Sequence, residues 1–192
     1  MVMDGVVVLL LLSFFSSMLM AVQRKTKYFL AYSWITYVLL VLLACCKSQT
    51  FEMLAASVMS LGFLSVFSFL INRCSRDLGE KVEDLRGLAF VSSPTAWIIA
   101  ISCYALSMLP PFAPFLLEHY LIEAVNDAYG IIILELLRIM LLFGFTKIAV
   151  NVLLKTEREV EFSSKFSMTY ALIVGLLVIV SLLLFIGVKG YA

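Results

Sequence analysis

Long apolar runs separated by short polar segments dominate the pattern of this chain. A bilayer core is about 30 Å thick, and a helix needs about 20 predominantly apolar residues to cross it. Apolar runs of about 18 or more residues therefore predict membrane-spanning helices. Such runs lie at roughly residues 5–22, 28–46, 51–72, 94–125, 129–154 and 167–188. We predict an all-α integral membrane fold with about six transmembrane helices, in a single membrane domain covering residues 1–192.

The fourth run is too long for one straight span and carries two prolines near its middle. A straight helix over residues 95–125 would be about 46 Å long, at roughly 1.5 Å per residue. Pro110 and Pro111 donate no backbone hydrogen bond and clash with the preceding turn, so the helix is predicted to break there. Backbone carbonyls freed at membrane depth need partners, so such a break is tolerated only inside protein or beside water.

Composition supports the membrane assignment, and the positions of the basic residues predict an orientation. Residues are 63% hydrophobic and the mean hydropathy is +1.07, well above what a soluble core of this size needs. With six spans, the loops on one side carry Arg24, Lys25, Lys27, Arg73, Arg76, Lys81, Arg86, Lys155, Arg158 and Lys165, whereas the other side carries only Lys47 and Lys189. Basic loops face the cytoplasm or matrix, so both termini are predicted on the intermembrane or periplasmic side.

Three smaller features follow from the same topology. Asp4 precedes the first run and basic residues follow it, the reverse of a cleavable signal, so residues 5–22 are expected to remain as a span. The loop over residues 73–93 alternates acids and bases and is interpreted as a solvated connector or a short surface helix, with partner docking as the alternative. Cys74 is expected to be reachable from the basic side, and Cys45 and Cys46 from the other.

Ionisable residues inside the apolar runs are the candidate functional groups. Glu118 and His119 follow the predicted break, and a broken span beside ionisable residues is typical of ion-coupled transporters. In the fifth run, Glu135 and Arg138 are about 60° apart at roughly 100° per residue and can pair, whereas Lys147 falls on the opposite face. The structural alternatives are a plain proline kink with Glu118 at an interface, and a Lys147 that extends to the membrane surface.

Several function classes find no support in the composition. The chain has one His and four Cys without a C-x-x-C pair, so neither a metal site nor a disulfide framework is predicted. No phosphate-binding glycine loop and no Ser/His/Asp set is present. We therefore predict no catalytic residues, no cofactor and no nucleic-acid partner on this chain.

Three short motifs occur in register along the chain. They are Lys27-Tyr-Phe-Leu-Ala-Tyr-Ser-Trp34, Asp84-Leu-Arg-Gly-Leu88 and Leu109-Pro-Pro-Phe-Ala-Pro-Phe115. In this order they resemble the KR-x-LAYSS, DL-K/R-GL and LPPLAGF elements of one known family, the antiporter-like membrane subunits of respiratory complex I. The resemblance covers roughly residues 5–192 and matches the C-terminal part of a longer module, favouring the second over the fourth subunit of NADH dehydrogenase.

The resemblance implies a transmembrane proton path within proton-pumping NADH:ubiquinone oxidoreductase, with no redox chemistry on this chain. It places the ionisable residue that follows the broken helix at Glu118 and a basic residue at Lys27. With Glu135, Arg138, Lys147 and His119, these form the predicted proton-path set. It also implies other membrane-arm subunits as partners, a chain supplying the missing N-terminal half, lipids, and a mitochondrial inner membrane or, alternatively, a bacterial or archaeal cell membrane.

Departures from the family pattern leave alternatives open. The third run carries only Glu52 at its edge, where the family usually has a mid-membrane Lys or His, and Pro114 replaces the motif glycine. The chain is therefore alternatively a non-conducting structural subunit, either a split or a reduced one. A further alternative is a part of an Mrp-type cation/proton antiporter or of a membrane-bound hydrogenase.

Overall fold

The computed structural model describes residues 5–47, 50–125, 127–154 and 168–189, which are almost entirely helical. The elements are α1 (Gly5–Val22), α2 (Thr26–Lys47), α3 (Phe51–Leu78), the 3-10 helix η1 (Val82–Leu85), α4 (Leu88–Val91), α5 (Ser93–Leu106), α6 (Ala113–Val125), α7 (Ala128–Leu153) and α8 (Met168–Lys189). The all-α membrane fold predicted from the sequence is confirmed.

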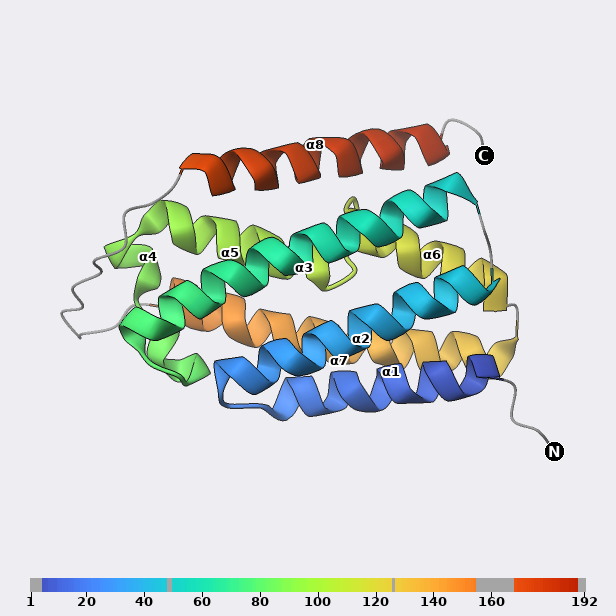
Figure 1. The fold of residues 1–192 in the computed structure, drawn as a ribbon, viewed down its shortest axis with the longest axis horizontal. Coiled ribbons are helices and arrows are strands. Elements are labelled where there is room, and N and C mark those ends of the chain that lie inside the picture. The colour runs from blue at the N-terminus through green and yellow to red at the C-terminus, as the bar shows by residue number, and fades with distance from the viewer. Residues whose placement is uncertain (1–4, 48–49, 126, 155–167, 190–192) are drawn as a thin grey trace.

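The long helices run side by side along the longest axis of the molecule (Figure 1). By length and composition, α1, α2, α3 and α7 can each cross a membrane, and α5 and residues 171–186 of α8 are shorter apolar helices. The predicted fourth span is divided into α5 and α6, as the two prolines require. The start of α1 and the end of α8 lie at the same end of the bundle, consistent with an even number of crossings.

The core lies between α1, α2, α3 and α7 and is built on aromatic side chains. Phe29 of α2, Phe67 of α3 and Phe145 of α7 are fully buried and meet edge to face, with ring centroids 5.4–6.4 Å apart. Such pairs stabilise a contact beyond the apolar area they bury, by about 0.5–1.5 kcal/mol. Met20 of α1 packs against Gly144 of α7, where a Cβ atom would collide with the methionine methyl group. The absence of a side chain at Gly144 therefore leaves the space that the end of the Met20 side chain fills.

Helix α3 extends further than the apolar pattern predicted. The third run was expected to end near residue 72, but α3 continues to Leu78 through Arg73, Arg76 and Asp77. These residues are charged but compatible with a helix, so the helix continues beyond the apolar stretch and projects its charges from the end of the bundle. The apolar pattern predicts where the helix leaves the membrane, whereas the helix itself ends at Leu78 and is capped by Gly79, which has a positive φ of 132°.

The segment after α3 is folded against the ends of neighbouring helices and is more ordered than the predicted solvated connector. Residues 81 and 25 form an isolated antiparallel bridge, in which Val82 donates its N–H to the Arg24 carbonyl at 2.8 Å. Thr26 donates both its N–H and its hydroxyl to the Glu80 carbonyl, at 2.8 and 2.9 Å. This segment therefore joins the α1–α2 connection.

The motif at residues 84–88 closes the end of α7. Gly87 has a left-handed φ of 85°, which favours glycine, and donates its N–H to the Leu154 carbonyl at 3.0 Å. Arg86 donates through Nε to Asn151 Oδ1 at 3.0 Å. Because the last carbonyls of a helix lack intrahelical partners, the Gly87 N–H satisfies a carbonyl at the α7 C-terminus, and Arg86 adds a bond to a side chain of the same end. The motif thus has a structural role in this chain.

Cysteine labelling can test the predicted orientation, but Cys74 is unsuitable as a probe because it is only 1% exposed. Cys45 and Cys46 are exposed. The expected reactivity of Cys74 was wrong, since the last turns of α3 are packed on the inner side. We expect an impermeant maleimide to label Cys45 and Cys46 from the face opposite the basic loops, and an Asp77→Cys variant from the basic face alone. Sealed vesicles of both orientations provide the measurement, with Cys74 as an unlabelled control. Labelling of Asp77→Cys from the other face would contradict the six-span orientation.

Candidate functional site

The helix break between α5 and α6 is a compact turn over residues 107–112. Ser107 donates its N–H to the Cys103 carbonyl at 3.0 Å, and Phe112 donates its N–H to the Leu109 carbonyl at 3.3 Å. Met108 adopts a left-handed φ of 54°, which is uncommon for a residue other than glycine, and is 1% exposed. The Pro110–Pro111 peptide bond is cis. The predicted break is therefore present at the predicted prolines: Met108 and Phe112 are buried on its inner side, whereas Pro110 is exposed.

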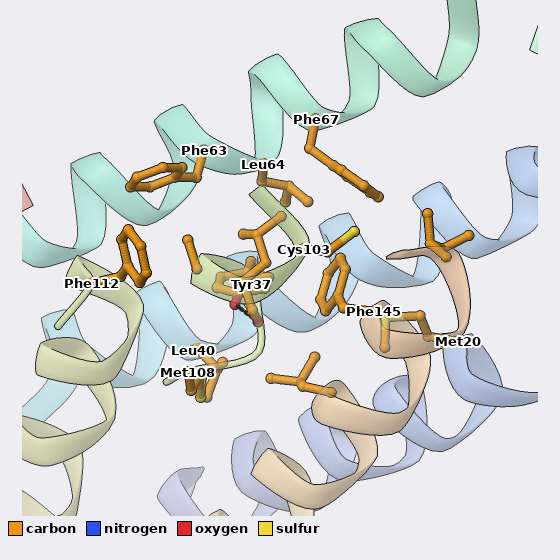
Figure 2. Close-up of a cluster of buried hydrophobic side chains, with 14 of the residues drawn as sticks. Met20, Tyr37, Leu40, Phe63, Leu64, Phe67, Cys103, Met108, Phe112 and Phe145 are labelled. Carbon is orange, nitrogen blue, oxygen red and sulfur yellow. Dashed lines mark hydrogen bonds between the residues drawn. The ribbon is translucent and has the colours of Figure 1, made fainter. Parts of the chain in front are cut away.

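Aromatic side chains pack against the inner side of this turn at Phe112. The Phe112 ring meets Phe63 of α3 edge to face at 5.9 Å and Tyr104 of α5 at 5.5 Å. Figure 2 shows Phe63 and Phe112 facing one another between α3 and the turn, with Met108 on the other side of the cluster. Tyr37 of α2 reaches the same region and donates its hydroxyl hydrogen to the Leu106 carbonyl. The buried side of the turn thus contacts α2, α3 and α5, and its Pro110 side is exposed.

Glu118 lies in α6 beyond the break and is the most deeply buried of the candidate residues. Only 2% of its surface is exposed, and neither carboxylate oxygen has a hydrogen-bond partner in the described part of the chain. Its Oε1 lies 3.8 Å from Arg138 Nη1, close enough for an ion pair but too far for a hydrogen bond. A buried carboxylate that is neither hydrogen-bonded nor exposed to water is costly to maintain in its charged form.

Arg138 of α7 lies between two carboxylates. Its Nη1 is 3.8 Å from Glu118 Oε1 and 3.5 Å from Glu135 Oε2, which confirms the pairing expected from helical spacing. The Arg138 side chain is 30% exposed and that of Glu135 is 47% exposed, so this three-residue cluster runs from the interior of the bundle to its outer surface. Burial opposes a charged carboxylate, whereas a neighbouring cation favours it. The two effects therefore act on Glu118 in opposite directions.

His119 does not join this cluster, as expected from its position about 100° around the helix from Glu118. Its side chain is 48% exposed and its Nε2 lies 3.4 Å from Glu123 Oε1, one helical turn further along α6. The ring stacks on Phe115, with an interplanar angle of 7°. His119 thus belongs to the outer surface of α6.

Lys147 and Lys27 lie at the basic end of the bundle. Lys147 Nζ donates to the Gln23 carbonyl at 2.6 Å and to the Ala21 carbonyl at 3.4 Å, so it binds the C-terminal end of α1. A cation is favoured there by the helix dipole. Lys27 is 55% exposed and lies 3.6 Å from Glu80. The structure therefore brings together Glu118, Glu135 and Arg138, and it places Lys27, Lys147 and His119 elsewhere.

The serines of α3, the helix without a mid-membrane cation, bond mainly within the helix. The Ser57 hydroxyl donates to the Met53 carbonyl and the Ser60 hydroxyl to the Ala56 carbonyl, both four residues earlier. Ser68 instead accepts a hydrogen bond from Trp34 Nε1 of α2 at 3.0 Å. Among the residues that the structure describes, no three His, Cys, Asp or Glu side chains gather as metal ligands.

Comparison with known sequences assigns the chain to a family. The sequence profile of the transmembrane family described as NADH:quinone oxidoreductase/Mrp antiporter matches residues 3–144. The chain belongs to this family. No curated protein matches the sequence. The resemblance carried by the three motifs is thereby confirmed at the level of an antiporter-like membrane subunit.

Solved structures show the same fold at low sequence identity. A chain of respiratory complex I from Thermus thermophilus with bound aureothin aligns with a TM-score of 0.71 and 19% identity, over 93% of this chain and 43% of that one. A chain of the membrane-bound sulfane sulfur reductase, an archaeal respiratory membrane complex, aligns with a TM-score of 0.75 and 18% identity, over 98% of this chain and 40% of that one. This chain therefore spans less than half the length of either.

Proposed function

We propose that this chain provides part of a transmembrane proton path in the membrane arm of a proton-pumping NADH:ubiquinone oxidoreductase. The observation that carries the proposal is Glu118, a buried carboxylate just beyond a helix break, without a hydrogen bond and 3.8 Å from a cation. Such a group can bind and release a proton as nearby charges move, because its two protonation states are stabilised by opposing effects. The redox chemistry belongs to other subunits, and this chain supplies the path.

In this proposal Arg138 is a permanent positive charge that pairs with either Glu118 or Glu135. A guanidinium does not lose its proton in proteins, so it cannot carry one. When Arg138 moves toward Glu135, Glu118 loses its counter-charge and binds a proton; when Arg138 moves back, the proton is released. Lys147 and Lys27 remain candidates for the path at the basic end, and His119 with Glu123 for the opposite surface.

The exposed side of the same cluster supports assembly with partner subunits. Glu135 lies on an exposed stripe of α7 with Ile132, Ile139 and Phe143, which are 56%, 42% and 66% exposed. A charged residue facing lipid at the bilayer centre costs roughly 2.5–3.5 kcal/mol on insertion scales. A polar partner helix facing Glu135 would remove this cost. We propose that membrane-arm subunits, including one that supplies an N-terminal half, cover this stripe, with residues 1–192 as one membrane domain.

The chains that co-purify with this one distinguish the alternative subunit identities and the alternative types of complex. We expect the chain to co-purify from gently solubilised membranes with other antiporter-like chains and with subunits that oxidise NADH and reduce ubiquinone. The second-subunit assignment and a mitochondrial inner membrane belong to the same proposal, with a bacterial or archaeal cell membrane as the alternative. Mass spectrometry of the purified complex identifies the accompanying chains. Recovery with antiporter-like chains alone would favour a cation/proton antiporter, and recovery with sulfur- or hydrogen-metabolising subunits a related respiratory complex.

A non-conducting structural subunit is the second candidate, and one observation favours it. The central part of α3 carries no ionisable residue between Glu52 and Arg73, so this helix has no side chain at membrane depth that could bind a proton. The deciding measurement is the number of protons translocated per electron by the reconstituted complex when Glu118 is replaced by Gln. A path through Glu118 predicts a lower ratio, whereas a structural subunit predicts an unchanged ratio.

A further inference from the structure

Pro110 leaves a specific carbonyl of α5 without its helical donor. In an α-helix the carbonyl of residue i accepts the N–H of residue i+4, so the Leu106 carbonyl would be paired with residue 110. Proline has no N–H, and the helix ends at Leu106. The Tyr37 hydroxyl, which belongs to α2, donates to this carbonyl instead, as the dashed line in Figure 2 marks. A side chain from another helix thus replaces the missing backbone donor.

The site of this hydrogen bond is apolar and fully buried. Tyr37 is 0% exposed, and Figure 2 shows its hydroxyl in a cluster with Leu64, Cys103 and Met108, which are each at most 1% exposed. A water molecule needs several polar partners to occupy a cavity, and these side chains offer almost none. If the hydroxyl were removed, the Leu106 carbonyl would therefore remain unpaired or the turn would have to rearrange.

The turn held by Tyr37 determines where Glu118 lies. Residues 107–112 are the covalent connection from α5 to α6, and Glu118 comes less than two turns into α6. The 3.8 Å separation between Glu118 and Arg138 depends on how α6 is set against α7. Tyr37 is thus connected to Glu118 through the turn.

We infer that Tyr37 is a positioning residue for the proton step at Glu118: by donating to the Leu106 carbonyl, it fixes the helix break in the arrangement that sets Glu118 opposite Arg138. The inference rests on the proposed proton path and adds a residue to it from α2. Nothing in the local sequence around Tyr37 marks it, since its role arises only where α2 meets the end of α5.

The test removes the Tyr37 hydroxyl and keeps the aromatic ring. In the reconstituted complex we expect Tyr37→Phe to show roughly half or more of the loss in protons per electron that Glu118→Gln shows, because one net hydrogen bond shifts a two-state equilibrium by about two- to tenfold. Genetic incorporation of 4-aminophenylalanine at position 37 restores a donor and should restore the ratio. Tyr104→Phe removes the hydroxyl of a half-exposed tyrosine on α5 and should leave the ratio unchanged.

Amide hydrogen exchange provides the second readout, independent of pumping. Tyr37→Phe should raise exchange at residues 107–112, with little change in α1 and α7, and 4-aminophenylalanine should reverse the effect. A normal ratio and normal exchange in Tyr37→Phe, together with a reduced ratio in Glu118→Gln, would overturn this inference alone. A normal ratio in Glu118→Gln would overturn the proton path and with it the role of Tyr37. A loss in Tyr37→Phe that 4-aminophenylalanine fails to restore would overturn the inference that donation to the Leu106 carbonyl positions Glu118.

Discussion

Replacing Glu118 by Gln should lower the number of protons translocated per electron while leaving most of the complex assembled. Gln has nearly the same shape and fits the same buried position, but it cannot bind and release a proton. Glu118 has no hydrogen-bond partner in the described structure, so the substitution removes no hydrogen bond that holds α6 in place. We expect proton transfer along the Glu118 path to slow by about a hundredfold or more, the lower end of the range for losing an acid–base group from a proton-transfer step.

The controls separate a carrier from a structural residue. Glu118→Asp keeps an ionisable carboxylate one methylene shorter and should retain part of the activity. His119→Ala should have a milder effect, because His119 is half exposed and pairs with Glu123 on the outer surface of α6. Proton uptake and electron transfer are measured together in liposomes at matched complex abundance. An unchanged ratio in Glu118→Gln would remove this residue from the path.

The sequence was sufficient for the arrangement of spans and for the break, because both depend on local chemistry. Apolar length and the ring of Pro110 act on the chain wherever it folds, and they predicted α5 and α6 as two halves of one span. Element ends were less predictable. The apolar run stops at the first charge after Asn72, whereas α3 continues to Leu78, since charged residues leave the membrane without ending a helix.

The candidate site was predictable to the extent that its residues share a helix or a motif. Glu135 and Arg138 pair at the expected spacing on α7, and Glu118 approaches them because α6 packs beside α7. Contacts between distant segments could not be predicted. The Lys147 bonds to the end of α1 join residues more than 120 positions apart, and the Tyr37 bond to Leu106 joins residues 69 positions apart. Such partners are set by tertiary packing, which no local pattern records.

Replacing Arg138 should affect both assembly and pumping, the second large effect that we expect. In Arg138→Gln, Glu118 keeps its burial but loses the cation 3.8 Å away. Leaving a fully buried charge without its partner costs about 3–5 kcal/mol. Arg138 is 30% exposed and Glu118 can be neutralised by a proton, so the actual cost should be smaller. We expect a several-fold decrease in assembled complex and, in what assembles, a Glu118 that stays protonated and transfers little.

The double variant Glu118→Gln/Arg138→Gln distinguishes the cost of an unpaired charge from the loss of Arg138 packing. With neither charge present, no buried carboxylate remains without its partner, so abundance should recover toward that of the unmodified complex while pumping stays low. Glu135→Gln is the matched control, since it keeps the Glu118–Arg138 pair and removes only the outer carboxylate. Abundance is measured by native gel electrophoresis and pumping by proton yield per electron. Full assembly and a normal ratio in Arg138→Gln would mean that Glu118 is controlled by charges other than Arg138. No recovery of abundance in the double variant would mean that Arg138 stabilises α7 through its contacts and not through its charge.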